Sequence, residues 1–266
     1  MKATRAICVY AVAVLIAVFF GGVRGDQEDD PERAQILAEV KSILEESDEF
    51  RAIEFVNGQG DPEMVANRYF DLVIDFYWQE GSLPEVVTFA RAGIQYALSK
   101  AQELPPEEAE GASKLRSIAK AMAYNLASFT WPGWDQEGIV VSERDLATGL
   151  DAAKLNLRLA HELSKPTSAV SAAHWVLGAQ YLAAAHYSEA VEAFTMAREK
   201  AHQADDEASE WMNHGYIGMA RIIEGSAKKE GEKALSEAID GLEKVNTEDA
   251  RFYTAQLKSV LEFFSK

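Results

Sequence analysis

Apolar residues beyond residue 30 recur every three to four positions over long segments, a spacing typical of amphipathic helices. No segment alternates with period two, and no Asn-Gly or Asp-Gly turn lies between β-rich runs. The only β-branched run, residues 138–141, is short. The pattern therefore predicts an all-α protein. Proline and glycine positions place the helices near residues 31–47, 62–80, 83–104, 106–130, 143–165, 167–185, 187–203, 206–225, 229–245 and 247–265.

Several of these helices have clear start signals. Asp30-Pro31 and Asp61-Pro62 each combine a capping side chain with a proline in the first turn. The loops between helices are mostly short, which predicts antiparallel neighbours. An internal repeat would distinguish stacked hairpins from a closed bundle.

The clearest repeat unit spans residues 171–204. A glycine and an alanine at its expected helix crossing, Gly178 and Ala190, allow two backbones to approach, and two aromatic residues, Tyr181 and Phe194, fill the space beside them. This unit resembles the tetratricopeptide repeat (TPR), whose signature is Leu-Gly-x-x-Tyr followed by Ala-x-x-x-Phe-x-x-Ala. The matching residues are Leu177, Gly178, Tyr181, Ala190, Phe194 and Ala197.

Weaker copies flank this unit at residues 67–100, at residues 125–160 and at residues 217–245. The middle copy is too long for one unit, and its excess lies at residues 131–138. The resemblance implies stacked antiparallel helical hairpins that form a right-handed TPR-like solenoid with a concave groove and a C-terminal capping helix. The predicted organisation is a leader at residues 1–25, N-terminal helices without a recognised motif at 26–66, and the repeat domain at 67–266.

The first 25 residues are typical of a secretory signal peptide. Lys2 and Arg5 precede fifteen consecutive apolar residues, 6–20, and small residues follow up to Gly25. Fifteen helical residues span roughly 22 Å, which is short of the hydrocarbon core that a membrane anchor must cross. We expect cleavage after Gly25 and export to a periplasmic or extracellular location, with no membrane attachment afterwards.

Composition and charge narrow the possible partners. The chain has 266 residues, with 26 Lys and Arg against 43 Asp and Glu, a formal net charge of −17. This acidity excludes a nucleic-acid partner, which requires clustered basic residues. The single cysteine, Cys8, lies in the predicted leader, so the mature chain has no thiol chemistry.

No catalytic or metal-binding motif is present. No two histidines are three or four residues apart, so no helix carries a paired metal site by itself. No Gly-x-Ser-x-Gly motif is present, and no carboxylate pair stands out among the many acidic residues. The sequence predicts a protein that is not an enzyme and has no metal or cofactor.

The aromatic residues are the best candidates for binding. Trp131 and Trp134 flank a Pro-Gly turn in the long insertion, and Asp135 follows them. These tryptophans either bind a partner, as insertions in repeat proteins often do, or fill the space between two repeats. In the TPR resemblance Trp175 faces the groove, and the following helix extends the same surface. The predicted binding residues are Trp131, Trp134, Asp135, Trp175, Ala179, Leu182, Trp211 and His214.

The TPR domains that clamp a terminal carboxylate line their groove with Lys, Arg and Asn. Here the corresponding residues are Ala172, Trp175, Val176 and Ala179, which do not support such a clamp. The leading hypothesis is an exported helical-repeat scaffold that binds an apolar, aromatic or basic protein or peptide. The alternative is a small-ligand or glycan-binding protein that uses the same tryptophan-rich cleft. A third hypothesis is a hydrolase with an acid pair in the groove.

Overall fold

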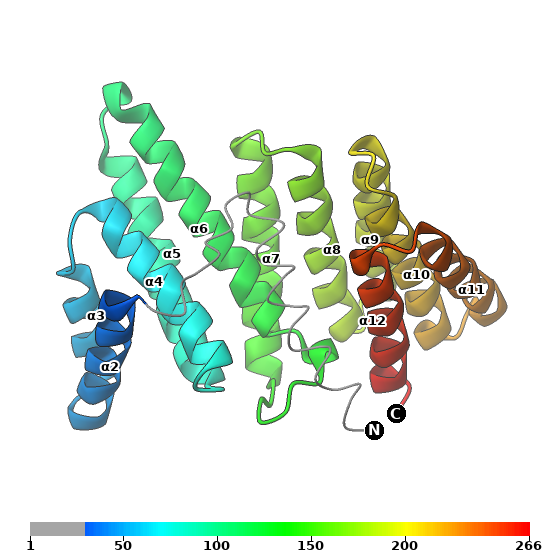
Figure 1. Cartoon of the computed structure of the whole chain (residues 1–266), viewed down its shortest axis with the longest axis horizontal. Helices are drawn as coiled ribbons and strands as arrows, with labels where there is room; N and C mark the ends of the chain where they lie inside the picture. Colours follow the sequence, from blue (N-terminus) through cyan, green and yellow to red (C-terminus); the bar gives the residue numbers. More distant parts are fainter. Residues whose placement is uncertain (1–29) are drawn as a thin grey trace. The chain divides into compact units, whose positions relative to one another are not determined.

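The computed structural model describes residues 30–266, so the predicted signal peptide and its cleavage site lie outside the described residues. Within this range the protein is all-α, as predicted, and no residue is in a strand (Figure 1). No described helix is long and apolar enough to cross a membrane. The α-helices are α2 (Pro31–Glu46), α3 (Glu49–Asn57), α4 (Pro62–Trp78), α5 (Leu83–Glu103), α6 (Ala109–Phe129), α7 (Glu143–Glu162), α8 (Thr167–Ala183), α9 (Tyr187–Gln203), α10 (Glu207–Glu224), α11 (Lys228–Val245) and α12 (Glu248–Phe264), with 3-10 turns η1 (Pro106–Glu108) and η2 (Pro132–Trp134).

The helix ends follow from local side chains. The Asp30 carboxylate accepts hydrogen bonds from two backbone N–H groups in the first turn of α2, and Asp61 does the same for α4. Ser142 and Asp145 form a reciprocal capping box at the start of α7. At the other end, α10 stops at Gly225, which has a φ of 86° that favours glycine.

One helix, α3, lies where the sequence pattern predicts no element. Asp48 caps it by accepting a hydrogen bond from the backbone N–H of Arg51, and it ends after nine residues at Gly58. Only Ala52 and Val56 of α3 are buried. A helix this short carries too few apolar positions for its periodicity to be recognised.

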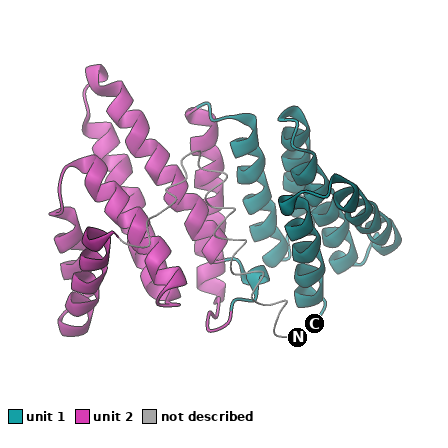
Figure 2. Cartoon of the chain, viewed as in Figure 1, with its two compact units in different colours: residues 1–23, 131–136, 164–266 teal, residues 24–130, 137–163 magenta. Residues whose placement is uncertain are grey.

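The chain forms two compact units, which divide it differently from the predicted domain ranges (Figure 2). The described part of unit 2 comprises residues 30–130 and 137–163 and contains α2 to α7. In this unit α4 packs on α5, α5 on α6 and α6 on α7, so each helix contacts its neighbour in sequence. Gly93 allows a close crossing, because a Cβ at this position would lie 2.5 Å from the Cβ of Tyr69.

The described part of unit 1 comprises residues 131–136 and 164–266 and contains η2 and α8 to α12. The hairpins α8–α9 and α10–α11 pack on each other through α9 and α10, and α12 packs on α10 and α11 as the predicted last helix. The crossing predicted at Gly178 is confirmed, because an added Cβ would lie 2.7 Å from the ring of Phe194. A second close crossing joins α10 and α11, where a Cβ on Gly218 would lie 2.7 Å from a backbone atom, the carbonyl oxygen of Gly231.

Candidate functional site

The insertion predicted to bind a partner carries an aromatic ring that packs among several others. The indole of Trp131 lies 5.0 Å from that of Trp134 and 5.9 Å from that of Trp175 on α8, measured between ring centroids. It also lies 6.3 Å from the ring of Tyr216 on α10 and 6.4 Å from that of Phe264 on α12. One side chain of the insertion therefore touches aromatic rings on three helices of unit 1. We call Trp131, Trp134, Trp175, Tyr216 and Phe264 the aromatic cluster.

The backbone of the insertion makes this packing possible. Gly133 lies under the Trp131 indole, and a Cβ on Gly133 would lie 2.4 Å from that ring. Asp135 ends the 3-10 turn with a φ of 47°, a left-handed conformation that aspartate tolerates better than most residues. The segment is thus a defined turn folded around its own tryptophan.

The predicted binding residues in this part of the structure differ in how much of each side chain is exposed. Trp131 is 1% exposed and Trp175 is 5% exposed, so both are core residues. Trp134 remains partly exposed and Asp135 is exposed. The indole N–H groups of Trp131 and Trp175 are buried and have no hydrogen-bond acceptor among the described residues. Trp131 therefore anchors the insertion in the core, while Trp134 and Asp135 are the residues of the insertion that lie at the surface.

Two further predicted groove residues lie on α8. Ala179 is 0% exposed and Leu182 is 2% exposed. Residues 170–180 of α8 are all buried, so these side chains contribute no exposed surface to the described structure. The predicted binding residues Ala179 and Leu182 are therefore buried among the described residues rather than exposed on a groove.

Trp211 and His214 form a second group, separate from the aromatic cluster. Successive helical residues are about 100° apart, so His214 and Tyr216 point to nearly opposite sides of α10. The Trp211 ring lies against Gly241 of α11, where an added Cβ would be 2.3 Å from the indole. Its centroid is 5.9 Å from that of His214, in an edge-to-face arrangement. Both side chains are partly exposed.

His214 belongs to a ladder of polar contacts across three helices. Arg198 and His202, one turn apart on α9, face Glu210 and His214, one turn apart on α10. His202 Nδ1 lies 2.9 Å from Glu210 Oε2, and Arg198 Nη2 lies 3.3 Å from Glu210 Oε1. Arg198 Nη1 lies 3.5 Å from His214 Nδ1, and His214 Nε2 lies 3.4 Å from Glu237 Oε2 on α11. We call these five residues the polar ladder.

The environment lowers the pKa of His214 below the ordinary histidine value. Burial is the largest cause, since the side chain is only 17% exposed, and the positive charges of Arg198 and Arg221 act in the same direction. Glu237 opposes this shift through its hydrogen bond and its charge. His214 is therefore neutral at pH 7, and its contacts place the ring proton on Nε2, which donates to Glu237 while Nδ1 accepts from Arg198.

Sequence reasoning identified His214 but missed the other members of the ladder. The signal was present, because 198 and 202, and then 210 and 214, are pairs spaced by four residues on either side of a short loop. Spacing by four residues places each pair on one face of its helix, and the structure brings these two faces together.

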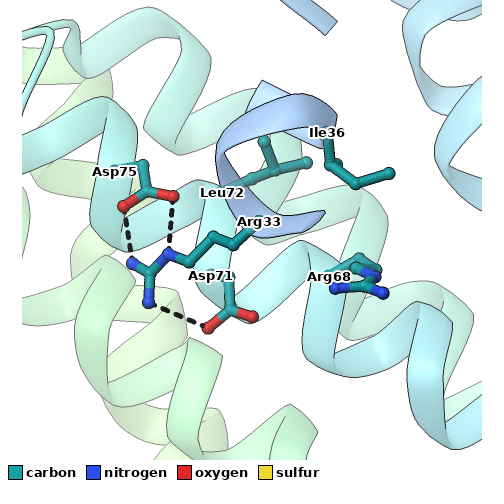
Figure 3. A pocket seen from close by; sticks show the side chains of 6 residues that line it. All are labelled: Arg33, Ile36, Arg68, Asp71, Leu72 and Asp75. Atoms are coloured by element: carbon teal, nitrogen blue, oxygen red, sulfur yellow. Dashed lines mark hydrogen bonds and ion pairs between the residues drawn. The ribbon is translucent and has the colours of Figure 1, made fainter. Parts of the chain in front are cut away.

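A small pocket in unit 2 lies between α2 and α4 (Figure 3). Arg33 of α2 makes a bidentate contact with Asp75 of α4, with Nε–Oδ2 at 2.9 Å and Nη2–Oδ1 at 2.5 Å, and an ion pair with Asp71 at 3.4 Å. A second ion pair joins Arg68 of α4 to Glu32 of α2. The charged groups that line this pocket pair with one another across the two helices, so they serve to hold α2 against α4.

No group of three or more histidine, cysteine or acidic side chains able to hold a metal ion occurs within residues 30–266. No protein-family model matches the chain, and no curated protein matches it.

Proposed function

We propose that this protein is an exported helical-repeat scaffold of TPR-like type that binds a protein or peptide partner. The α8–α9 hairpin supports the TPR-like assignment, since Gly178 and Phe194 meet at the crossing where the repeat signature places them. Stacked helical hairpins typically serve as binding scaffolds, because each repeat adds surface to a continuous face.

The observation that carries the proposal is the difference in burial between the residues of the insertion. Trp131 is buried in the aromatic cluster and fixes a six-residue irregular segment, while Trp134 and Asp135 of the same segment reach solvent. A binding loop held in one conformation loses less entropy when it meets its partner. Tryptophan is also among the residues that contribute most to binding energy at interfaces.

The exposed residues define the chemistry of the partner. Trp134 offers an indole to an apolar or aromatic group, and Asp135 offers a carboxylate to a basic group. The negative charge of the whole chain favours the approach of a basic partner. Glycan stacking on Trp131 or Trp175 is disfavoured, since a sugar needs an open ring face and both rings are almost fully buried.

The test is affinity capture from the exported fraction with two baits, the parent protein and a Trp134→Ala, Asp135→Asn double variant. We expect a protein that the parent captures and the double variant does not, with binding of the purified partner weakened at least about tenfold, or roughly 1.4 kcal/mol. Trp78→Ala is the matched control, because Trp78 is a partly exposed tryptophan of unit 2 and is not among the predicted binding residues. Equal capture by both baits would refute a binding role for the insertion.

A further inference from the structure

The polar ladder is arranged so that one added proton changes its interactions. Neutral His214 can accept a hydrogen bond from Arg198 at Nδ1 while it donates from Nε2 to Glu237. A protonated imidazole carries N–H on both nitrogens and can accept from neither. The contact between α9 and His214 therefore exists only in the neutral form.

We propose that the polar ladder is an acid-sensitive latch in unit 1: a proton taken up by His214 replaces its contact with Arg198 by repulsion between two cations, and α9 separates from α10 more readily. This inference goes beyond the proposed partner binding and does not depend on it.

The charged groups around His214 come from all three helices of the ladder. On α9, Arg198 opposes protonation; on α10, Arg221 does the same. On α11, Glu237 favours protonation, but it also lies 3.7 Å from Lys233, which shares its charge. Burial adds to the two arginines, so the folded protein resists the proton that the unfolded chain accepts.

The direction of the pH effect follows from this. The pKa of His214 in the folded state lies below its unfolded value of 6.5, so the unfolded chain binds protons more tightly. The contribution of His214 to stability is fully present above about pH 6.5 and is lost as the pH falls below this value. The other histidine of the ladder, His202, has a side chain that is 76% exposed, so solvent screens its contact with Glu210.

The polar ladder and the aromatic cluster share helix α10. Separation of α9 from α10 at the ladder therefore also affects the packing of the aromatic cluster. On α10, His214 is two residues from Tyr216, whose ring stacks on Phe194 of α9 at 4.9 Å and contacts Trp131 and Trp175. The interface between α9 and α10 thus has a polar half and an aromatic half. A loosened polar half leaves α10 held to α9 mainly by the aromatic half.

The test compares thermal unfolding at about pH 7.5 and about pH 5.5, where histidine changes charge. The variant is His214→Gln, whose amide can donate to Glu237 and accept from Arg198 but does not titrate. The control is His186→Gln, since His186 is an exposed histidine of the same unit outside the ladder. We expect the melting temperature of the parent and of His186→Gln to fall on acidification, and that of His214→Gln to fall less.

An NMR titration of the histidine ring signals in the parent tests the same inference without any variant. We expect one histidine, assigned to His214 by its absence from the variant or by its contacts with the Trp211 ring, to titrate below the ordinary value. Titration of His214 at or above that value, or an equal fall in melting temperature for parent and His214→Gln, would overturn the latch.

Discussion

Removal of the Trp131 side chain tests whether the insertion is anchored as the structure indicates. The indole is 1% exposed and contacts four other aromatic rings, so Trp131→Ala leaves a cavity in the core of unit 1. Truncation of a fully buried aromatic residue costs about 3–5 kcal/mol in free energy of unfolding. Trp134→Ala is the matched comparison, and its partly exposed ring should cost at most about 2 kcal/mol.

A third variant separates packing from hydrogen bonding. Trp131→Phe keeps a ring in the cluster and removes an N–H that is buried without an acceptor, a group whose burial costs about 1–3 kcal/mol. Its loss of stability should therefore be less than half that of Trp131→Ala. Urea unfolding followed by circular dichroism at 222 nm measures all three values. A Trp131→Ala protein as stable as the parent would show that the aromatic cluster contributes nothing and that the anchoring argument is wrong.

Three further substitutions test the packing and the charges. Gly178→Ala places a Cβ 2.7 Å from an aromatic ring of α9 and should destabilise the protein by about 1–3 kcal/mol, as measured by urea unfolding. Arg33→Met leaves the buried carboxylate of Asp75 without its bidentate cation and should cost about 3–5 kcal/mol. Asp249→Asn should raise the melting temperature at pH 7, because partial desolvation of this exposed residue and the neighbouring carboxylates of Asp206 and Glu248 raise its pKa and disfavour its ionised form.

Each of these three predictions has a control variant or an outcome that would contradict it. Gly111→Ala lies in a helix with only a flexible side chain nearby and should be neutral or stabilising by up to about 1 kcal/mol, so equal losses at Gly111 and Gly178 would contradict the crossing. Arg51→Met breaks an exposed ion pair and should cost at most about 1 kcal/mol. For Asp249→Asn, the gain should shrink as the pH falls toward the pKa of Asp249, and a gain independent of pH would refute the electrostatic cause.

Most of the fold was predictable because helix boundaries depend on local residues. Asp30 and Asp61 cap their helices as their positions before proline indicate. Gly178 marks a helix crossing that the repeat spacing also identifies. These features involve residues near each other in sequence, and spacing alone reveals them.

Only some residues of the candidate site were predictable, and their arrangement was not. Trp131 and Trp175 are 44 positions apart, and only folding shows that their rings meet and that both are buried. The same limit applies to Ala179, because the environment of a small residue depends on long-range packing. His214 carried no motif, since its two hydrogen-bond partners lie on two other helices, α9 and α11.

Because the insertion packs in unit 1, the protein cannot be cut at a single point in the chain without disrupting that unit. Residues 131–136 pack with residues 164–266, although the helices on either side of them in the chain, α6 and α7, belong to unit 2. A fragment that begins at Ser164 would retain Trp175, Tyr216 and Phe264 but lose the indole that packs among them. Newly uncovered aromatic surface of this kind promotes self-association. A proteolytic or recombinant piece with continuous sequence is thus a poor substitute for the folded unit, and the unit is better dissected by substitution within the whole chain.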